Sequence, residues 1–226
     1  MMKLFLTSTR HCIENISSFK SLINRTTKLI ILPVNYHKDY LQCAEDVWNH
    51  FDRNPYNKES IFYETVRPFI DAGIDIDNIV VINLYTDNIN YVKYKLLQPN
   101  TILYLGGGYP ENIVENVLEY DLLKTLKQCE VIVGESAGSM APFKEFFVYP
   151  DQDYPEYKRF KGLGLLKKRM TVIPHFNLQK SEILESCHKF LKRHRRANIY
   201  CIKDGGYIVI ENNKITEFKD TILLTR

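Results

Sequence analysis

A serine lies between small residues in the segment Gly-Glu-Ser-Ala-Gly at positions 134–138, directly after the apolar run 131–133. The pattern G-x-S-x-G between a strand and a helix is typical of a nucleophile elbow, where small neighbours allow a sharp turn and the hydroxyl projects from it. The helix that follows begins with backbone N–H groups that can donate hydrogen bonds to an anion. We therefore predict that Ser136 is a nucleophile for acyl transfer.

A second glycine-rich turn, at positions 106–108, follows the predicted strand 101–105. Glycines leave their backbone amides unhindered. The N–H of Gly107 or Gly108, together with that of Ala137, can therefore form an oxyanion hole, which contributes a few kcal/mol to transition-state stabilisation. A phosphate-binding loop is the alternative use of such a turn, but the Lys-Ser/Thr pair of a P-loop is absent and Tyr-Pro follows instead.

A serine nucleophile needs a general base, and histidine is the natural candidate. Of the six histidines, only His175 stands at the end of a predicted strand, 170–173, that comes after the serine. An acidic side chain is expected to orient the imidazole through its far ring nitrogen. Asp204, in Lys-Asp-Gly-Gly at 203–206, is our candidate, because the glycines favour a turn that points the carboxylate inward; Asp-Gly is also a common turn former.

The chain order Ser136, His175, Asp204 separates several kinds of enzyme. Hydrolases of the α/β-hydrolase fold also use the elbow, but in the order serine, acid, histidine. That order would require His188 or His194, both within a basic segment, to act as the base. Class I glutamine amidotransferases have a cysteine at the elbow, where this chain has serine. A Ser-His-Asp triad is therefore the arrangement that the sequence favours.

These residues need a scaffold of strands that end side by side. Short apolar runs alternate with helical patterns, which is typical of βαβ units and a mostly parallel sheet covered by helices on both faces. The predicted strands are 4–7, 28–34, 78–84, 101–105, 130–133, 170–173, 199–202 and 207–210. The predicted helices are 13–23, 61–72, 88–96, 111–127 and 181–193, with Ser181 as a cap of the last. We expect a single three-layer α/β domain over residues 1–226 that closes on a hairpin at 211–214.

Composition excludes several functional classes. The net charge of +3, from 30 basic and 27 acidic residues, does not indicate a nucleic-acid or membrane partner. The five cysteines lack metal-ligand spacing, and their odd number suits a reducing compartment. No segment has the length of a signal peptide or a membrane span. We expect a cytoplasmic protein, monomer or homodimer, that uses no metal or other cofactor.

The combination Gly-Gly-Gly, Gly-x-Ser-Ala-Gly, Pro-His and Asp-Gly resembles the peptidase E family of serine peptidases (family S51), which includes aspartyl dipeptidases and more distant cyanophycinases. The resemblance runs from the strand at 28–34 to the final hairpin. It implies a class I glutamine amidotransferase-like fold, a small peptide substrate and the roles already given for Ser136 and His175. Asp204 matches the acid, which is glutamate in the dipeptidases.

Two departures from the family bear on substrate choice. Members commonly have asparagine after the three glycines, where this chain has Tyr109, beside the expected substrate pocket. The segment 146–166 also differs from the dipeptidases, and its Lys158, Arg159 or Lys161 can bind an acidic substrate side chain or remain in solvent. Dipeptides with an N-terminal aspartate are thus one expected substrate class. Another small amide or ester, or a catalytically silent small-molecule-binding role, is the alternative.

Overall fold

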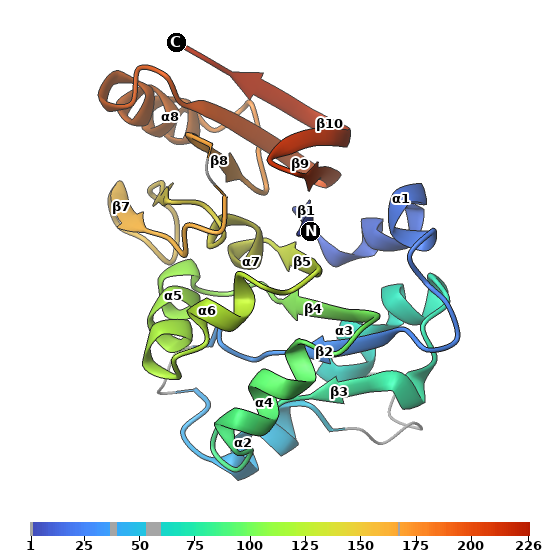
Figure 1. Ribbon diagram of the computed structural model, residues 1–226. Coiled ribbons are helices and arrows are strands. Elements are labelled where there is room, and N and C mark those ends of the chain that lie inside the picture. The colour runs from blue at the N-terminus through green and yellow to red at the C-terminus, as the bar shows by residue number, and fades with distance from the viewer. Residues whose placement is uncertain (1, 37–39, 53–59, 167) are drawn as a thin grey trace.

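The computed structural model describes residues 2–36, 40–52, 60–166 and 168–226. Eight strands form the main sheet in the order β10-β9-β1-β5-β4-β2-β3, with β8 paired to β9 (Figure 1). The strands are β1 (Lys3–Thr7), β2 (Lys28–Ile31), β3 (Ile79–Val81), β4 (Thr101–Leu105), β5 (Val131–Glu135), β8 (Met170–Ile173), β9 (Asn198–Glu211) and β10 (Lys214–Leu224). Neighbours are parallel except where β9 meets β1 and β10. A mostly parallel α/β sheet is therefore confirmed.

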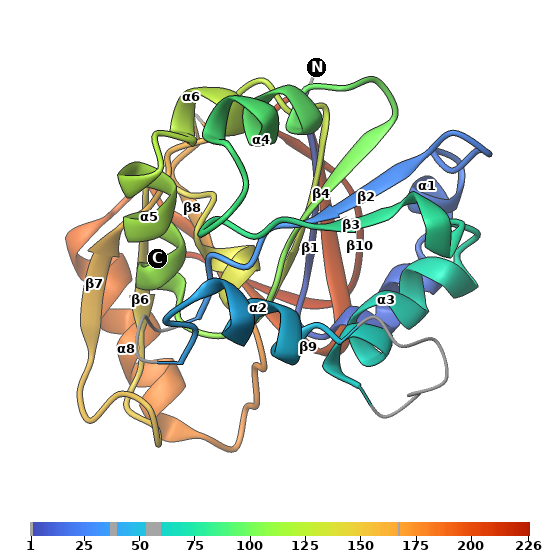
Figure 2. The same cartoon turned by 90° about the horizontal axis from the view of Figure 1, so that it is seen from below.

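Helices cover both faces of this sheet (Figure 2). The α-helices are α1 (Ser17–Lys20), α2 (Ala44–His50), α3 (Ile61–Asp71), α4 (Ile89–Leu96), α5 (Pro110–Glu119), α6 (Leu123–Leu126), α7 (Ala137–Met140) and α8 (Ser181–Arg193). Two short 3-10 helices are η1 (Arg10–Asn15) and η2 (Ile76–Asn78). A small antiparallel pair, β6 (Glu145–Val148) and β7 (Lys158–Lys161), lies outside the main sheet; the sequence did not predict it.

Alternation along the strands explains the two separate cores. On β1, Leu4 and Leu6 pack into the core that contains α4 to α7, whereas Phe5 packs into the core that contains η1, α1 and α3. Successive side chains of a strand point to opposite faces, so a strand that is apolar on both faces must be covered on both. A third cluster joins α8 to β8 and β9.

Several predicted elements are shorter or divided. The helix expected at 111–127 is broken between α5 and α6, where Asp121 adopts a φ of 51°; aspartate tolerates this left-handed conformation and the apolar spacing continues across it. The helix expected at 13–23 is replaced by η1 and α1. Ser181 is the first residue inside α8 and does not cap it; Lys180 holds that position.

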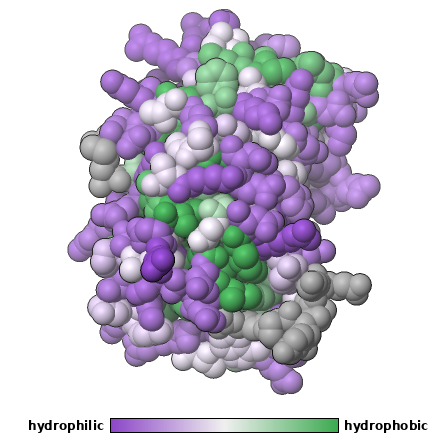
Figure 3. Space-filling view, turned by 90° about the vertical axis from the view of Figure 1, so that its right-hand side faces the viewer, coloured by the Kyte–Doolittle hydropathy of each residue, from purple (hydrophilic) through white to green (hydrophobic). Residues whose placement is uncertain are grey.

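The molecular surface in Figure 3 is mainly hydrophilic, with apolar side chains gathered near the centre of that face. None of the helices formed by the described residues combines the length and hydrophobicity needed to cross a bilayer.

Candidate active site

Ser136 sits at a sharp turn between β5 and α7, as the sequence predicted. Its backbone has φ 49° and ψ −112°, a conformation that an L-residue keeps only when its surroundings force it. Glycines on either side make the turn possible. A Cβ at Gly134 would lie 2.2 Å from the carbonyl oxygen of Gly138, and one at Gly138 would lie 2.0 Å from that of Leu105. The turn also hydrogen-bonds to the end of β1, through Ser136 N–H and Thr7 O at 2.9 Å.

The three residues predicted as a triad lie in one hydrogen-bonded line. Ser136 Oγ is 3.0 Å from His175 Nε2, and His175 Nδ1 is 2.7 Å from Asp204 Oδ1. His175 follows β8 after one residue, Pro174, and β8 runs parallel to the part of β9 that leads to Asp204. In this geometry Nδ1–H donates to the carboxylate and Nε2 is left to accept the serine proton.

The position of Asp204 differs from the prediction. We expected a turn between two strands, but β9 continues without interruption from Asn198 to Glu211. The glycines form a bulge in that strand: Gly205 has a φ of 78°, and the register with β10 shifts there. A bulge redirects a side chain while the strand continues. Burial raises the pKa of Asp204, but hydrogen bonds from His175 and Ser8 outweigh that effect and lower it.

Ser8, the residue after β1, is a member of this cluster that the sequence did not reveal. Its hydroxyl donates to Asp204 Oδ1 at 2.9 Å and accepts the backbone N–H of His175 at 2.7 Å. No local motif marks it, because only the order of strands in the sheet brings the end of β1 next to these residues.

The glycine-rich turn after β4 lies against the serine. A Cβ at Gly107 would be 3.3 Å from Ser136 Cβ and 3.8 Å from its Oγ. Asn35 holds the turn through two hydrogen bonds. Its side-chain amide donates to Gly107 O, and its backbone carbonyl accepts the Tyr109 N–H at 3.1 Å. Gly108, at φ 140°, passes so close to Asn35 O that a Cβ would lie 2.7 Å away.

The third expected donor, Ala137, opens α7. The N–H of a first helical residue has no acceptor within its own helix. Gly107 packs against Ser136 and Ala137 follows it in the chain, so two of the residues expected to form the oxyanion hole lie next to the serine.

Glu135, next to the serine, is buried, and both of its carboxylate oxygens accept hydrogen bonds away from the cavity lining. Its Oε1 accepts from the Arg10 backbone at 3.3 Å and from Arg10 Nε at 3.2 Å, while the Tyr104 hydroxyl donates to Oε2. Arg10 also donates to the Thr65 hydroxyl at 3.0 Å. Burial raises the pKa of Tyr104 well above its ordinary value, so the phenol stays a donor. This network anchors the elbow to β4 and to the start of η1.

A cavity of about 290 Å³ opens beside Ser136 and His175. Its wall includes the carboxylates Asp151 and Asp153 from the loop after β6, and its described lining contains no lysine or arginine. The described residues that line it are Gly108, Pro110, Ser136, Ala137, Met140, Val148, Tyr149, Asp151, Asp153, Tyr154, Ile173, Pro174 and His175.

The two residues expected to contact substrate are placed differently. The Tyr109 ring packs edge-on against that of Tyr154, which lines the cavity, with their centroids 6.2 Å apart. Arg159 does not line the cavity; it lies on β7, with Nη1 3.4 Å from His194 Nε2. Its position therefore gives no support to the expectation that it binds substrate.

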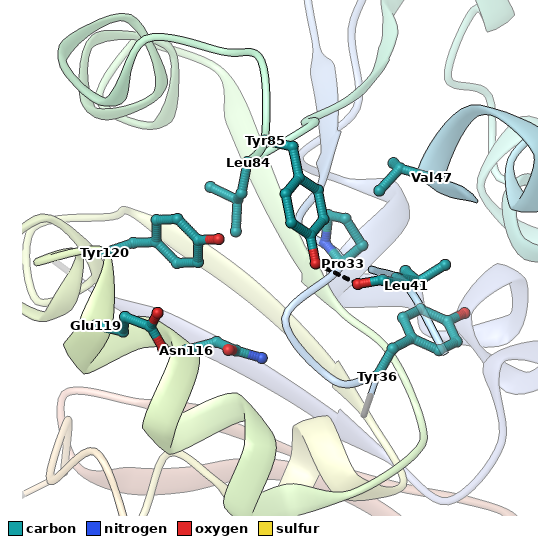
Figure 4. A pocket seen from close by; sticks show the side chains of 9 residues that line it. All are labelled: Pro33, Tyr36, Leu41, Val47, Leu84, Tyr85, Asn116, Glu119 and Tyr120. Carbon is teal, nitrogen blue, oxygen red and sulfur yellow. Dashed lines mark hydrogen bonds between the residues drawn. The ribbon is translucent and has the colours of Figure 1, made fainter. Parts of the chain in front are cut away.

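Another cavity, of about 120 Å³, lies between the end of β2, α2 and α5 (Figure 4). Figure 4 shows Tyr85 pointing across it, with its hydroxyl donating to Leu41 O. None of the nine side chains drawn there is a serine, cysteine or histidine, so this cavity offers no nucleophile and base. Within the described ranges, no three His, Cys, Asp or Glu side chains gather in a metal-binding cluster.

Comparisons with known proteins show the family and the fold of this chain. The sequence model of "Peptidase family S51" matches residues 56–218, which is more than half of the chain. The chain therefore belongs to peptidase family S51 and is a serine-type peptidase. No curated protein sequence matches it.

Two solved structures have the same fold. A candidate peptidase E protein from Listeria monocytogenes EGD-e superposes with a TM-score of 0.62 at 16% identity, covering 97% of this chain and 98% of that one. A peptidase from an acI-B1 Actinobacterium gives a TM-score of 0.57 at 16% identity, with coverage of 100% and 88%. The class I glutamine amidotransferase-like arrangement predicted from the sequence is thus confirmed.

Proposed function

We propose that this peptidase hydrolyses small peptides through a covalent acyl-enzyme, with Ser136 as nucleophile, His175 as general base and Asp204 as the acid that orients it. The observation that carries the proposal is the unbroken line of contacts from Ser136 Oγ through His175 to Asp204, at 3.0 and 2.7 Å. Nucleophile and base within about 2.6–3.2 Å of each other, with a third group orienting the base, is the pattern of activated serine enzymes.

In the first half of the reaction, His175 Nε2 takes the proton from Ser136 as Oγ attacks the peptide carbonyl. The carbonyl oxygen becomes an oxyanion, which the N–H groups of Gly107 or Gly108 and of Ala137 stabilise. His175 then gives its proton to the leaving amine, the C–N bond breaks and an ester to Ser136 remains. The Asp204 carboxylate stabilises the imidazolium while the proton is held there.

In the second half, water replaces the amine. His175 takes a proton from the water, the hydroxide attacks the ester carbonyl, and the same amides hold the oxyanion. When the C–O bond to the enzyme breaks, the proton returns to Ser136 Oγ and the acid product leaves. Apart from the water that is consumed, the proposed steps use only side chains and backbone groups of this chain.

The cavity gives a first indication of substrate class. Its volume of about 290 Å³ suits a residue or two of peptide rather than a long chain. The family resemblance suggests an N-terminal aspartate, but Asp151 and Asp153 stand in the wall without a lysine or arginine among the described lining residues. Like charges repel, so we expect a neutral or basic substrate side chain to be preferred over an acidic one at this cavity.

The test is hydrolysis of a dipeptide panel that contains Asp-X, Lys-X and neutral members, together with simple amides and esters. Wild type is compared with Ser136→Ala and with Ser186→Ala, which removes another buried serine hydroxyl, on α8. We expect cleavage by wild type and Ser186→Ala and a loss of at least about 1,000-fold in Ser136→Ala. Equal rates in all three would refute the proposal; cleavage of esters or amides alone would keep the mechanism and discard the peptide substrate.

A further inference from the structure

Ser8 lies at a position where three parts of the site meet. It is the first residue after β1, and β1 lies between β5, which leads to Ser136, and β9, which carries Asp204. The chain is fixed on both sides of this point: Thr7 O accepts the N–H of Ser136 at 2.9 Å, and Ser8 N–H donates to Gly206 O at 3.3 Å. The Ser8 hydroxyl therefore has a defined position relative to both strands.

The Ser8 hydroxyl contacts both His175 and Asp204, the proposed base and acid. It accepts the His175 backbone N–H at 2.7 Å and donates its own proton to Asp204 Oδ1 at 2.9 Å. It also lies 3.3 Å from His175 Nδ1. The Ser8 hydroxyl thus accepts one hydrogen bond from the backbone of the base and donates its single proton to the acid.

Burial distinguishes Ser8 from the groups it contacts. Its relative exposure is 0%, whereas the side chains of His175 and Asp204 are 44% and 68% exposed. Exposed side chains keep several conformations available unless another contact restricts them. Of the three residues, Ser8 is the one that is fully buried, and its contacts restrict the other two.

The backbone of His175 also needs support. Its φ is 54°, an uncommon value for a residue with a side chain. Such a conformation persists where surrounding contacts impose it. The hydrogen bond to Ser8 ties this segment to the end of β1, and the bond from Phe176 N–H to Ile202 O, at 3.0 Å, ties it to β9.

From these contacts we infer that Ser8 is a positioning residue that holds the His175 imidazole and the Asp204 carboxylate in line with Ser136. The inference rests on the proposed function, because it gives Ser8 no role unless Ser136 and His175 react. Ser8 is not among the described residues that line the cavity, so its role is exerted through the other two residues. It also lies outside the segment 56–218 that the family model matches.

Ser8→Ala removes the acceptor of the His175 N–H and the buried donor to Asp204. Hydrogen bonds to charged groups are among the stronger ones. We therefore expect the reactivity of Ser136 to fall about 10- to 100-fold. Ser8→Cys keeps the approximate shape but has a weak donor and a weak acceptor, so it should resemble Ser8→Ala rather than wild type.

The experiment measures the rate at which a fluorophosphonate phosphonylates Ser136, so no substrate has to be known. The serine oxygen bonds to phosphorus, fluoride leaves and the serine proton passes to His175. Saturation kinetics separate the maximal rate of labelling from the inhibitor concentration that gives half of it. We expect both Ser8 variants to lower the maximal rate and to leave the half-saturating concentration within about twofold of wild type. Ser186→Ala is the control for loss of a buried serine hydroxyl.

A cycle with Asp204→Ala then tests whether Ser8 acts through the acid. Because one of its two partners is already gone, Ser8→Ala is expected to cost at least threefold less in that background than in wild type. Equal losses in both backgrounds, or full reactivity of Ser8→Ala, would overturn the inference while leaving labelled Ser136 in support of the function. If wild type is not labelled at all, the proposed function fails, and the inference about Ser8 fails with it.

Discussion

The distances around Gly138 give the displacement that a methyl group added there would force on the elbow. The new Cβ lies 2.0 Å from Leu105 O and 3.0 Å from Gly106 O. Carbon and carbonyl oxygen in close contact sit about 3.3 Å apart. The two backbones must therefore separate by about 1.3 Å, and no change of side-chain conformation relieves the contact, because both oxygens belong to the main chain.

This displacement reaches the nucleophile directly. Ser136 is two residues from Gly138, and its Oγ is 3.0 Å from His175 Nε2, so a shift of this size is large enough to break the contact. A misplacement of about 1 Å can cost about 100-fold in rate. Overpacking a well-filled interior costs about 1–3 kcal/mol of stability, which leaves a typical domain folded. We thus expect Gly138→Ala to fold and to react at least about 100-fold more slowly.

The assay combines fluorophosphonate labelling of Ser136 with chemical denaturation of the same preparation. Gly164→Ala is the matched control: the nearest atom to its Cβ is Lys144 Cγ at 3.8 Å, and its φ is 60°. That variant should lose about 1–2 kcal/mol through the left-handed backbone alone and keep its labelling rate. A Gly138→Ala protein that is labelled as fast as wild type would refute the reasoning about the elbow.

Two further predictions concern carboxylates. Burial raises the pKa of Asp204, yet hydrogen bonds from His175 and Ser8 hold it below its ordinary value, so the stabilisation from the ionised form is present above about pH 4 and disappears as pH falls through the lowered pKa. The difference in unfolding free energy between wild type and Asp204→Asn should shrink below about pH 4; a difference that is constant from about pH 7 to 3 would contradict this. Replacing Asp151 and Asp153 together with asparagine should raise kcat/KM for Asp-X dipeptides relative to Lys-X by about fivefold or more at low salt, and an unchanged ratio would exclude their influence on specificity.

The elbow was predictable because its sequence pattern is local. Gly134, Ser136 and Gly138 fall within five residues after an apolar run, and a Cβ at Gly134 would collide with Gly138 O inside the same turn. The collision at Gly138 is with Leu105 O on β4, a contact that the local sequence does not show. His175 and Asp204 were predicted from residue type and from their places relative to predicted strands. Their distances were not, since the pairing of β8 with β9 joins segments far apart in sequence.

Ser8 could not be predicted from its neighbours. It matters because β1 lies between β5 and β9, and strand order is a property of the whole sheet. The expectation that Arg159 binds substrate had a similar weakness. The sequence predicted a loop where the structure has β7, so it could not show whether the Arg159 side chain points toward the cavity. The bulge at Asp204 was mistaken for a turn because Asp-Gly-Gly suits both.

The central claim is that Ser136 becomes covalently acylated with help from His175. The most direct test is mass spectrometry of the fluorophosphonate-treated protein, with the adduct mapped to a peptide, for wild type and His175→Ala. A single adduct on Ser136 in wild type, formed at least about 100-fold more slowly in His175→Ala, is the result that this account predicts. An adduct on another residue, or labelling of Ser136 that does not depend on His175, would contradict it.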